Sequence, residues 1–285
     1  MMVTIQHGVN GVGTLHLTPD RSFAARQRLA WVDLADAACL WRLIGILAWF
    51  DIRQRYRGSM LGPFWLTLST ALMVGSMGVV YAFLFRMGLR DYLPFLGLSL
   101  VLWGYLGALV TDGCTTYTLV EGTIRSVRMP LSLYAARVVV RTLLVLAHNV
   151  VVIVVVFALL RVWPGANAVF ILPAVALWLV DSFAACLLLG ALCARFRDIP
   201  PIVASIMQMA FFISGVIWKP SQLHENAWLL GFNPFFTLLE VMRAPLLGEV
   251  PGAAIWASAL GFSAVLCGVS WLLFVRVRGR IAFWV

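Results

Sequence analysis

The sequence predicts an all-α integral membrane protein with six membrane-spanning helices, on three observations. First, 62% of the 285 residues are apolar and only 12% are charged, whereas a soluble domain carries about 25% charged residues. Second, the chain contains long apolar runs, and the run from residue 64 to residue 85 carries no charge. About 20 apolar residues in a helix cross a hydrocarbon core of roughly 30 Å. Third, basic residues gather beside such runs, as they do at cytoplasmic helix ends.

The first 58 residues precede the predicted spans. Residues 1–30 are polar and predict a cytoplasmic tail. Within residues 31–58, apolar positions recur at helical spacing between Asp33 and Phe50, and Arg42 interrupts them. This pattern favours a helix lying along the membrane interface, followed by a basic cluster. A seventh span is the alternative.

Residues 59–285 form the predicted six-span domain. The spans are expected at about residues 63–86, 93–117, 131–161, 168–194, 199–217 and 252–275. If the N-terminus lies inside, this topology puts most of the 21 Lys and Arg residues on the cytoplasmic side. Both termini are therefore predicted to be cytoplasmic.

The segment 220–247, between the fifth and sixth spans, differs from a plain loop. It contains two moderately apolar stretches, 226–232 and 235–247, separated by Asn233 and Pro234. Apolar stretches of this length are too short to span and are often re-entrant or interfacial. We expect two short helices dipping into the outer leaflet, with an amphipathic surface helix as the alternative.

Several function classes are disfavoured by composition and motifs. The net charge of +9 is dispersed between apolar runs, whereas a nucleic-acid binder gathers its basic residues on one face. The five cysteines have no metal-ligand spacing, so no metal site is expected. No G-x-x-x-x-G-K-[ST] phosphate loop and no catalytic constellation occurs. The sequence therefore predicts a non-catalytic membrane subunit without a cofactor of its own.

A series of short motifs follows the predicted interfacial helix in a fixed order. They are Arg-Tyr-Arg-Gly-Ser at 55–59, Arg-Ser-Val-Arg-Met-Pro at 125–130, Arg-Phe-Arg-Asp-Ile-Pro at 195–200, Phe-Phe-Ile-Ser-Gly-Val-Ile-Trp at 211–218 and Asn-Pro-Phe at 233–235. In this order, the chain from about residue 31 resembles the permease subunit of bacterial ABC-2 type exporters. The resemblance is to the polysaccharide branch, which moves O-antigen, capsule or related lipid-linked glycans.

The resemblance implies a homodimer in the bacterial inner membrane, clamped onto two ATP-binding-cassette ATPase subunits that bind ATP and Mg²⁺. It also implies that a cytoplasmic turn couples the permease to the ATPase. The candidate coupling residues are Arg53, Arg55, Arg57, Glu121, Arg125 and Arg128. The alternative is that these arginines set topology and bind the headgroups of membrane lipids.

Aromatic side chains are the candidates for the translocation path, because their electron-rich faces stack on the C–H faces of sugar rings. The candidates are Tyr81, Phe83, Trp103, Tyr105, Phe211, Phe212 and Trp218. The alternative is an interfacial aromatic belt, which needs no ligand.

Ionisable residues at membrane depth rarely face lipid, so each needs a partner or a function. We expect Asp112 to pair with Arg137 or Arg141. His148 and Asp181 are expected to face each other near the middle of their spans, with a proton relay as the alternative. Glu240 and Arg243 are three residues apart on one helix face and are expected to pair or to line the exit of the path.

Three alternative functions stay open at this point. An ABC-2 permease could carry a teichoic-type polymer, a lipid or a drug. A secondary transporter is disfavoured because the two halves show no internal repeat. A membrane-bound glycan or lipid transferase would need an interfacial cluster of Asp, His and Arg larger than the one formed by Asp112 and Arg141.

Overall fold

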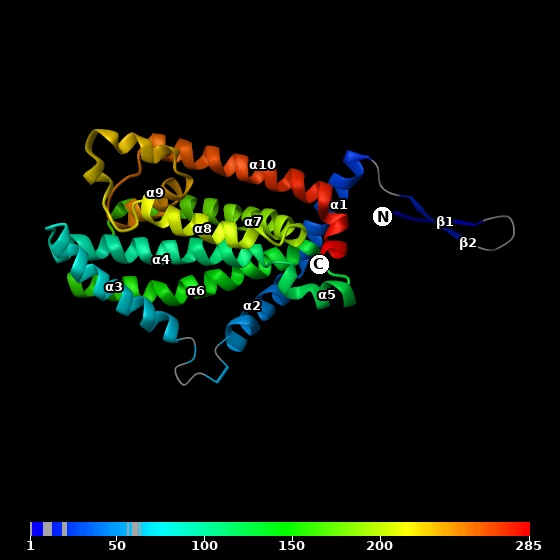
Figure 1. Ribbon diagram of the computed structural model, residues 1–285, viewed down its shortest axis with the longest axis horizontal. Coiled ribbons are helices and arrows are strands. Elements are labelled where there is room, and N and C mark those ends of the chain that lie inside the picture. The colour runs from blue at the N-terminus through cyan, green and yellow to red at the C-terminus, as the bar shows by residue number, and fades with distance from the viewer. Residues whose placement is uncertain (1, 8–12, 19–21, 56, 59–61, 63) are drawn as a thin grey trace.

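A computed structural model describes residues 2–7, 13–18, 22–55, 57–58, 62 and 64–285. Helices form the body of the molecule, arranged as a bundle whose long axis is horizontal in Figure 1. The α-helices are α1 (Phe23–Cys39), α2 (Trp41–Arg55), α3 (Phe64–Leu84), α4 (Leu89–Cys114), α5 (Glu121–Ser126), α6 (Leu131–Leu160), α7 (Ile171–Arg195), α8 (Ile199–Ile213), α9 (Pro234–Leu246) and α10 (Ala253–Trp284). Three 3₁₀ segments accompany them: η1 (Thr118–Val120), η2 (Ala166–Phe170) and η3 (Pro220–Phe232).

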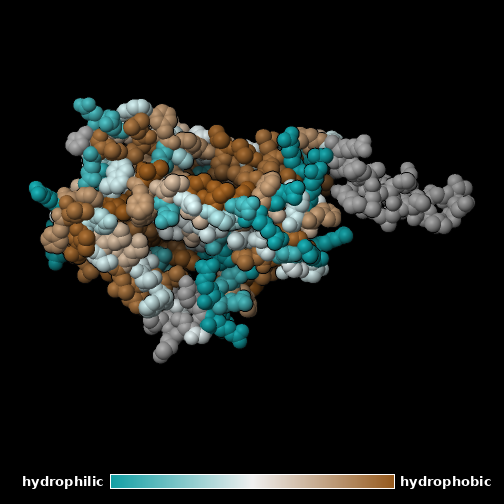
Figure 2. Space-filling view, viewed as in Figure 1, coloured by the Kyte–Doolittle hydropathy of each residue, from teal (hydrophilic) through white to brown (hydrophobic). Residues whose placement is uncertain are grey.

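The two ends of the bundle differ in content (Figure 1). One end carries α1, α5 and the C-terminus, and we call it the α5 end. The opposite end carries η3 and α9, and we call it the α9 end. On the face shown in Figure 2, hydrophobic residues cover much of the bundle, and hydrophilic residues gather toward the α5 end. This distribution is that of an integral membrane protein, as predicted from composition.

The segment predicted as a tail contains defined elements in the part that the structure describes. Strands β1 (Met2–His7) and β2 (Gly13–Thr18) pair antiparallel, with Met2 opposite Thr18 and His7 opposite Gly13. Helix α1 then begins at Phe23, before the predicted boundary at residue 31. The residues after Phe23 are rich in Ala, Arg and Gln, which are strong helix formers. The predicted single interfacial helix is two helices, α1 and α2, with a break at Leu40.

Among the residues that the structure describes, five helices are long and apolar enough to cross a membrane: α3, α4, α6, α7 preceded by η2, and α10. Each lies at a predicted span. The predicted fifth span, 199–217, contains α8, which has only 15 residues and is therefore about 22 Å long. Helix α8 alone is shorter than a hydrocarbon core of about 30 Å, so the count of six spans stays a prediction.

Helix α10 is longer than the predicted sixth span. It continues through Arg276, Arg278 and Arg280 to Trp284, so the basic residues expected to follow the span lie within the helix. At the α9 end, the two short helices expected between residues 220 and 247 are η3 and α9. Asn233 separates them and caps α9, because its side-chain oxygen accepts hydrogen bonds from the backbone N–H groups of Phe235 and Phe236.

Helix α4 is the most buried of the spanning helices and packs against α3, α6, α7, α8 and α9. Its contact with α7 is close because glycines replace side chains at the crossing. A Cβ atom on Gly113 of α4 would lie 3.6 Å from the Sγ and 3.7 Å from the Cα of Cys186 on α7. In the turn that follows α4, the Cβ of Thr116 would lie 2.9 Å from a Cβ atom on Gly190 of α7. The backbones of α4 and α7 therefore approach each other through small residues, as is common between membrane helices.

A carboxylate from α1 caps the start of α6. Pro130, at the N-cap of α6, offers no capping side chain. Asp33, which is buried, accepts hydrogen bonds from the backbone N–H groups of Leu131 (3.2 Å) and Ser132 (2.9 Å). The guanidinium of Arg278 on α10 lies 3.0 Å from the same carboxylate. Asp33 therefore joins α1, α6 and α10 and satisfies helix N–H groups that otherwise lack partners.

Replacing Asp33 with Ala removes this junction. The change leaves the α6 N–H groups and Arg278 without their acceptor, so we expect the free energy of unfolding to fall by about 3 to 5 kcal/mol. Denaturant unfolding of the purified protein in detergent measures the change. Asp36→Ala is the matched control, since Asp36 lies on the same helix and is exposed. Equal losses for the two variants would contradict the capping role.

Candidate functional site

Near the α5 end, four charged side chains form what we call the ion network: Asp51, Asp112, Arg137 and Arg141. Arg137 and Arg141 of α6 both donate to Asp51 of α2, the latter at 3.3 Å. Arg141 also lies 2.9 Å from Asp112 of α4. The expected pair of Asp112 and Arg141 is therefore present. Asp51, the third participant, could not be predicted, because its partners Arg137 and Arg141 are 86 and 90 positions away in the chain.

The ion network holds three helices together where charges are shielded from water. The side chain of Arg141 is only 11% exposed and sits between two carboxylates. Opposite charges at this spacing compensate one another, whereas removal of one would leave an uncompensated buried charge. The network therefore fixes α2 to α6 and to the last turns of α4, which lead directly to η1 and α5.

The predicted basic cluster lies at the end of α2. Arg53, Arg55 and Arg57 are exposed. A guanidinium nitrogen of Arg55 lies 4.0 Å from Asp112, which makes it a peripheral member of the same charged region.

The predicted coupling turn is a short helix, α5, at the same end of the bundle as the C-terminus (Figure 1). Arg125 pairs with Glu121 at 2.7 Å, one helical turn away. Arg125 also donates to the backbone carbonyl of Val285, from Nε at 3.1 Å. Arg128 is exposed and has no ion-pair partner among the described residues. Helix α5 is thus tied to the end of α10, and the unpaired cation Arg128 follows two residues after it.

Four of the predicted path aromatics gather at the end of α8 that is nearer α9. The ring centroids of Trp103 and Phe211 are 5.8 Å apart, and those of Phe211 and Phe212 are 5.2 Å apart. The indole N–H of Trp218 donates to the carbonyl of Phe212 at 2.8 Å. Phe235 of α9 packs on Trp103 at 5.7 Å. We call these five residues the α8 aromatic cluster.

The other predicted path aromatics lie elsewhere. Tyr105 is buried inside the bundle, where it stacks on Trp178 and shares a 2.7 Å hydrogen bond with Ser182. Tyr81 stacks on Phe85 of the same chain segment. Phe83 is 80% exposed on the outside of α3. The structure therefore does not bring these three together with the α8 aromatic cluster.

At the α9 end, Arg243 is almost completely buried and forms what we call the Arg243 clamp. The expected pair with Glu240 is present. Arg243 also donates to Ser99 Oγ of α4 and to the carbonyl of Gly215, both at 2.8 Å, and its guanidinium lies 4.3 Å from the ring centroid of Phe95. Gly215 has a φ of +60°, a backbone conformation that favours glycine. The clamp therefore fastens α9 and the turn after α8 to α4.

The expected meeting of His148 and Asp181 is wrong. Asp181 of α7 accepts a hydrogen bond from Ser263 of α10, and His148 Nδ1 lies 2.7 Å from the carbonyl oxygen of Leu144 in its own helix. A serine on the neighbouring helix bonds Oδ1 of Asp181, while Oδ2 has no hydrogen-bond partner among the described residues. Sequence spacing alone does not indicate that neighbour.

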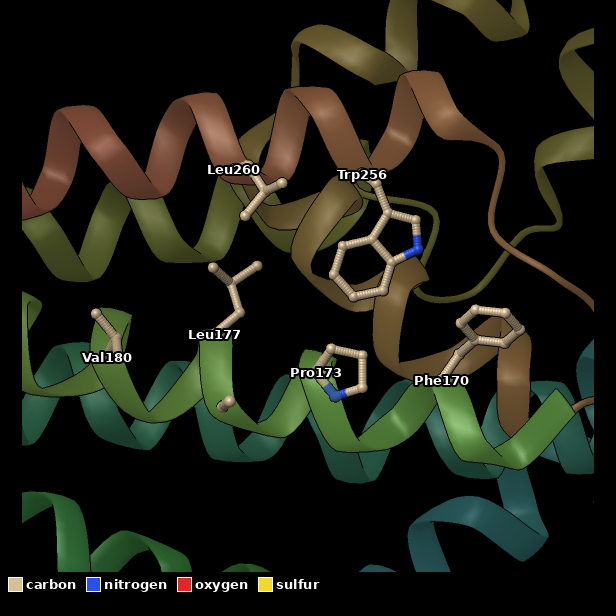
Figure 3. Close-up of a pocket in the computed structure, with 7 residues that line it drawn as sticks. Phe170, Pro173, Leu177, Val180, Trp256 and Leu260 are labelled. Atoms are coloured by element: carbon tan, nitrogen blue, oxygen red, sulfur yellow. The ribbon is translucent and has the colours of Figure 1, made fainter.

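An apolar groove of about 520 Å³ lies between α7 and α10. In Figure 3, side chains from η2 and α7 point toward side chains of α10 across this groove. The labelled lining residues are Phe170, Pro173, Leu177, Val180, Trp256 and Leu260. Its lining contains no charged residue, so it suits hydrocarbon rather than sugar hydroxyls or phosphate.

Residues 42–247 match the family model for ABC-2 type transporters. The matched segment runs from α2 to the turn after α9 and includes the ion network, α5, the α8 aromatic cluster and the Arg243 clamp. The chain belongs to the ABC-2 type transporter family.

Two curated relatives of this ABC-2 transporter carry the same name. An O-antigen export system permease protein RfbA of Myxococcus xanthus is 25% identical over 201 residues, covering 68% of this chain and 76% of that protein. A protein of that name from Klebsiella pneumoniae is 22% identical over 206 residues, covering 70% of this chain and 78% of its own length. The similarity therefore extends over most of each protein. This ABC-2 transporter chain is a multi-pass membrane subunit of the bacterial inner membrane.

Replacing Arg243 with Met tests the Arg243 clamp in this ABC-2 transporter. The change removes the bonds to Ser99 and Gly215 and leaves Glu240 without its cation, so we expect a loss of about 3 to 5 kcal/mol in the free energy of unfolding. Denaturant unfolding in detergent measures it. Arg90→Met, at an exposed position in the first turn of α4, is the control. A loss no larger than that of the control would contradict the clamp.

Proposed function

We propose that this chain is the permease subunit of an ATP-driven exporter that moves a lipid-linked polysaccharide, such as O-antigen or capsule, across the bacterial inner membrane. In this proposal two copies form the channel, and two separate ATPase subunits bind ATP and Mg²⁺ and supply the energy. Membership of the ABC-2 family and the names of the curated relatives support the export of a glycan.

The observation that carries the channel proposal is an unpaired amide on α8. Only Met207 and Ala210 of this helix are buried, and Gln208 lies exposed between them. Gln208 makes no hydrogen bond with any other described residue. An amide facing hydrocarbon without a partner costs several kcal/mol. This cost supports a channel in which the exposed face of α8 lies against a second subunit or a polar path rather than against lipid.

The α8 aromatic cluster lies on the same helix and suits a sugar polymer. Phe212 is exposed and packs on the half-buried ring of Phe211, which in turn packs on the half-buried ring of Trp103. Aromatic faces bind the C–H faces of many different sugars without fixed charge. An amide followed by aromatic rings along one helix supports passage of a polar but uncharged chain.

A partner must supply the energy, and α5 is the element placed to receive it. The ion network links α2 and α6 to the turns of α4 that precede α5. A rigid displacement of α5 by a docked ATPase would therefore be passed to three helices at once. Domain motions of this kind are transmitted through packed elements with little internal deformation.

Replacing Gln208 with Leu tests the channel role of α8. The variant loses its polar contact with the path or the second copy, so we expect several-fold slower export at an unchanged level of membrane-inserted protein. Export of the cell's own lipid-linked glycan, in a strain lacking the chromosomal copy, measures the rate. Met209→Leu, at the next exposed position, is the control. Export by Gln208→Leu at the wild-type rate would count against the proposal.

Replacing Arg128 with Glu tests the coupling role of α5. Reversal of this unpaired, exposed charge is expected to reduce co-purification of the ATPase by at least tenfold, while membrane insertion stays normal. The control is Arg276→Glu, an exposed arginine of α10. Normal recovery of the ATPase with Arg128→Glu would rule out this role for α5.

A further inference from the structure

The turn between α7 and α8 presents an aromatic side chain at the α5 end of the bundle. Phe196 follows the last residue of α7 and is 54% exposed. The guanidinium of Arg195 lies 5.7 Å from its ring centroid and 5.9 Å from that of Trp284. These contacts favour one orientation of the Phe196 ring while leaving much of its surface open.

This turn lies next to α5. One hollow of about 290 Å³ is lined both by Thr118 and Glu121, from η1 and α5, and by Arg197 and Pro200, from the turn and the start of α8. Two segments about 75 residues apart in the chain therefore border the same depression. A partner that covers α5 also reaches the turn.

The surface around the hollow combines unpaired positive charge with exposed apolar side chains. Arg128 and Arg197 are exposed and have no carboxylate within ion-pair distance among the described residues. Leu119 of η1 and Val127 beside α5 are 70% and 45% exposed. Apolar and aromatic anchors beside arginines are typical of the centres of protein interfaces.

The position of this surface favours a protein partner over lipid. Helix α5 lies at the end of the bundle with the C-terminus (Figure 1), beyond the last turns of α4 and α7 rather than along their sides. Lipid chains contact the sides of a bundle, whereas a soluble subunit contacts its end. Charge complementarity then requires acidic groups on the partner.

We propose that α5 and the turn 196–198 form a two-part docking surface for the ATPase subunit. The ATPase presents carboxylates to Arg128 and Arg197 and inserts a side chain into the hollow that Thr118, Glu121 and Arg197 line. Phe196 packs against the surface of the ATPase. This inference rests on the proposed function, since it names how the ATPase of that exporter binds. The turn supplies a second contact that is separate from α5.

Two variants of the turn test this surface, each with a matched control. Phe196→Ser and Arg197→Glu are compared with Phe50→Ser, on the exposed face of α2, and with Arg276→Glu on α10. The affinity of the purified ATPase for each permease in detergent is measured. We expect at least a tenfold loss for each turn variant and less than a twofold change for the controls. An acidic-to-basic change in the ATPase that restores binding to Arg197→Glu would identify the facing carboxylate.

The Arg128→Glu variant separates failure of this inference from failure of the proposed function. If Arg128→Glu loses the ATPase while both turn variants bind it normally, the turn is not part of the docking surface. If none of the three variants binds more weakly, the proposed coupling through α5 is itself overturned. If the turn variants keep the ATPase but lose binding to phosphatidylglycerol vesicles, the turn contacts lipid headgroups and the inference is also overturned.

Discussion

The arrangement of these helices depends on ion pairs and charge-assisted hydrogen bonds that are shielded from water. Inside a bilayer the hydrophobic effect gives little preference for helix association, because lipid tails are as apolar as leucine side chains. At the α5 end, Asp33 caps α6 and pairs with Arg278, and Asp51 holds Arg137 and Arg141. These carboxylates come from α1 and α2 and attach that pair of helices to the bundle.

Buried polar contacts also join the helices at the α9 end, where the central group is a cation rather than a carboxylate. There a cation, Arg243, gathers Glu240, Ser99 and the carbonyl of Gly215 around itself. Tyr92 of α4 adds a 2.6 Å hydrogen bond to the carbonyl of Ile217 in the same turn. Helix α4 is therefore fastened at both ends by polar contacts, whereas α8 beside it leaves most of its apolar length uncovered.

Apolar runs and short polar spacings could be predicted from the sequence, but long-range partners could not. The helices at residues 64–85 and 131–161 follow from hydrophobicity, and the Glu240–Arg243 pair follows from a spacing of three. Asp33 looked like an ordinary helix-start residue, because its partners Ser132 and Arg278 are 99 and 245 positions away. The sequence signal that marks Gln208 is a single amide inside an uncharged apolar stretch. Asp181 and His148 share a position near mid-span, but depth in the membrane alone does not make two residues neighbours.

The glycine crossing of α4 and α7 limits how such a protein can change shape. Gly113 of α4 lies directly against Cys186 of α7, and in the turn after α4 the Cβ of Thr116 would lie 2.9 Å from a Cβ on Gly190. We therefore expect α4 and α7 to move together as one unit. A passage for a polymer would then widen by displacement of α8, of which only Met207 and Ala210 are buried.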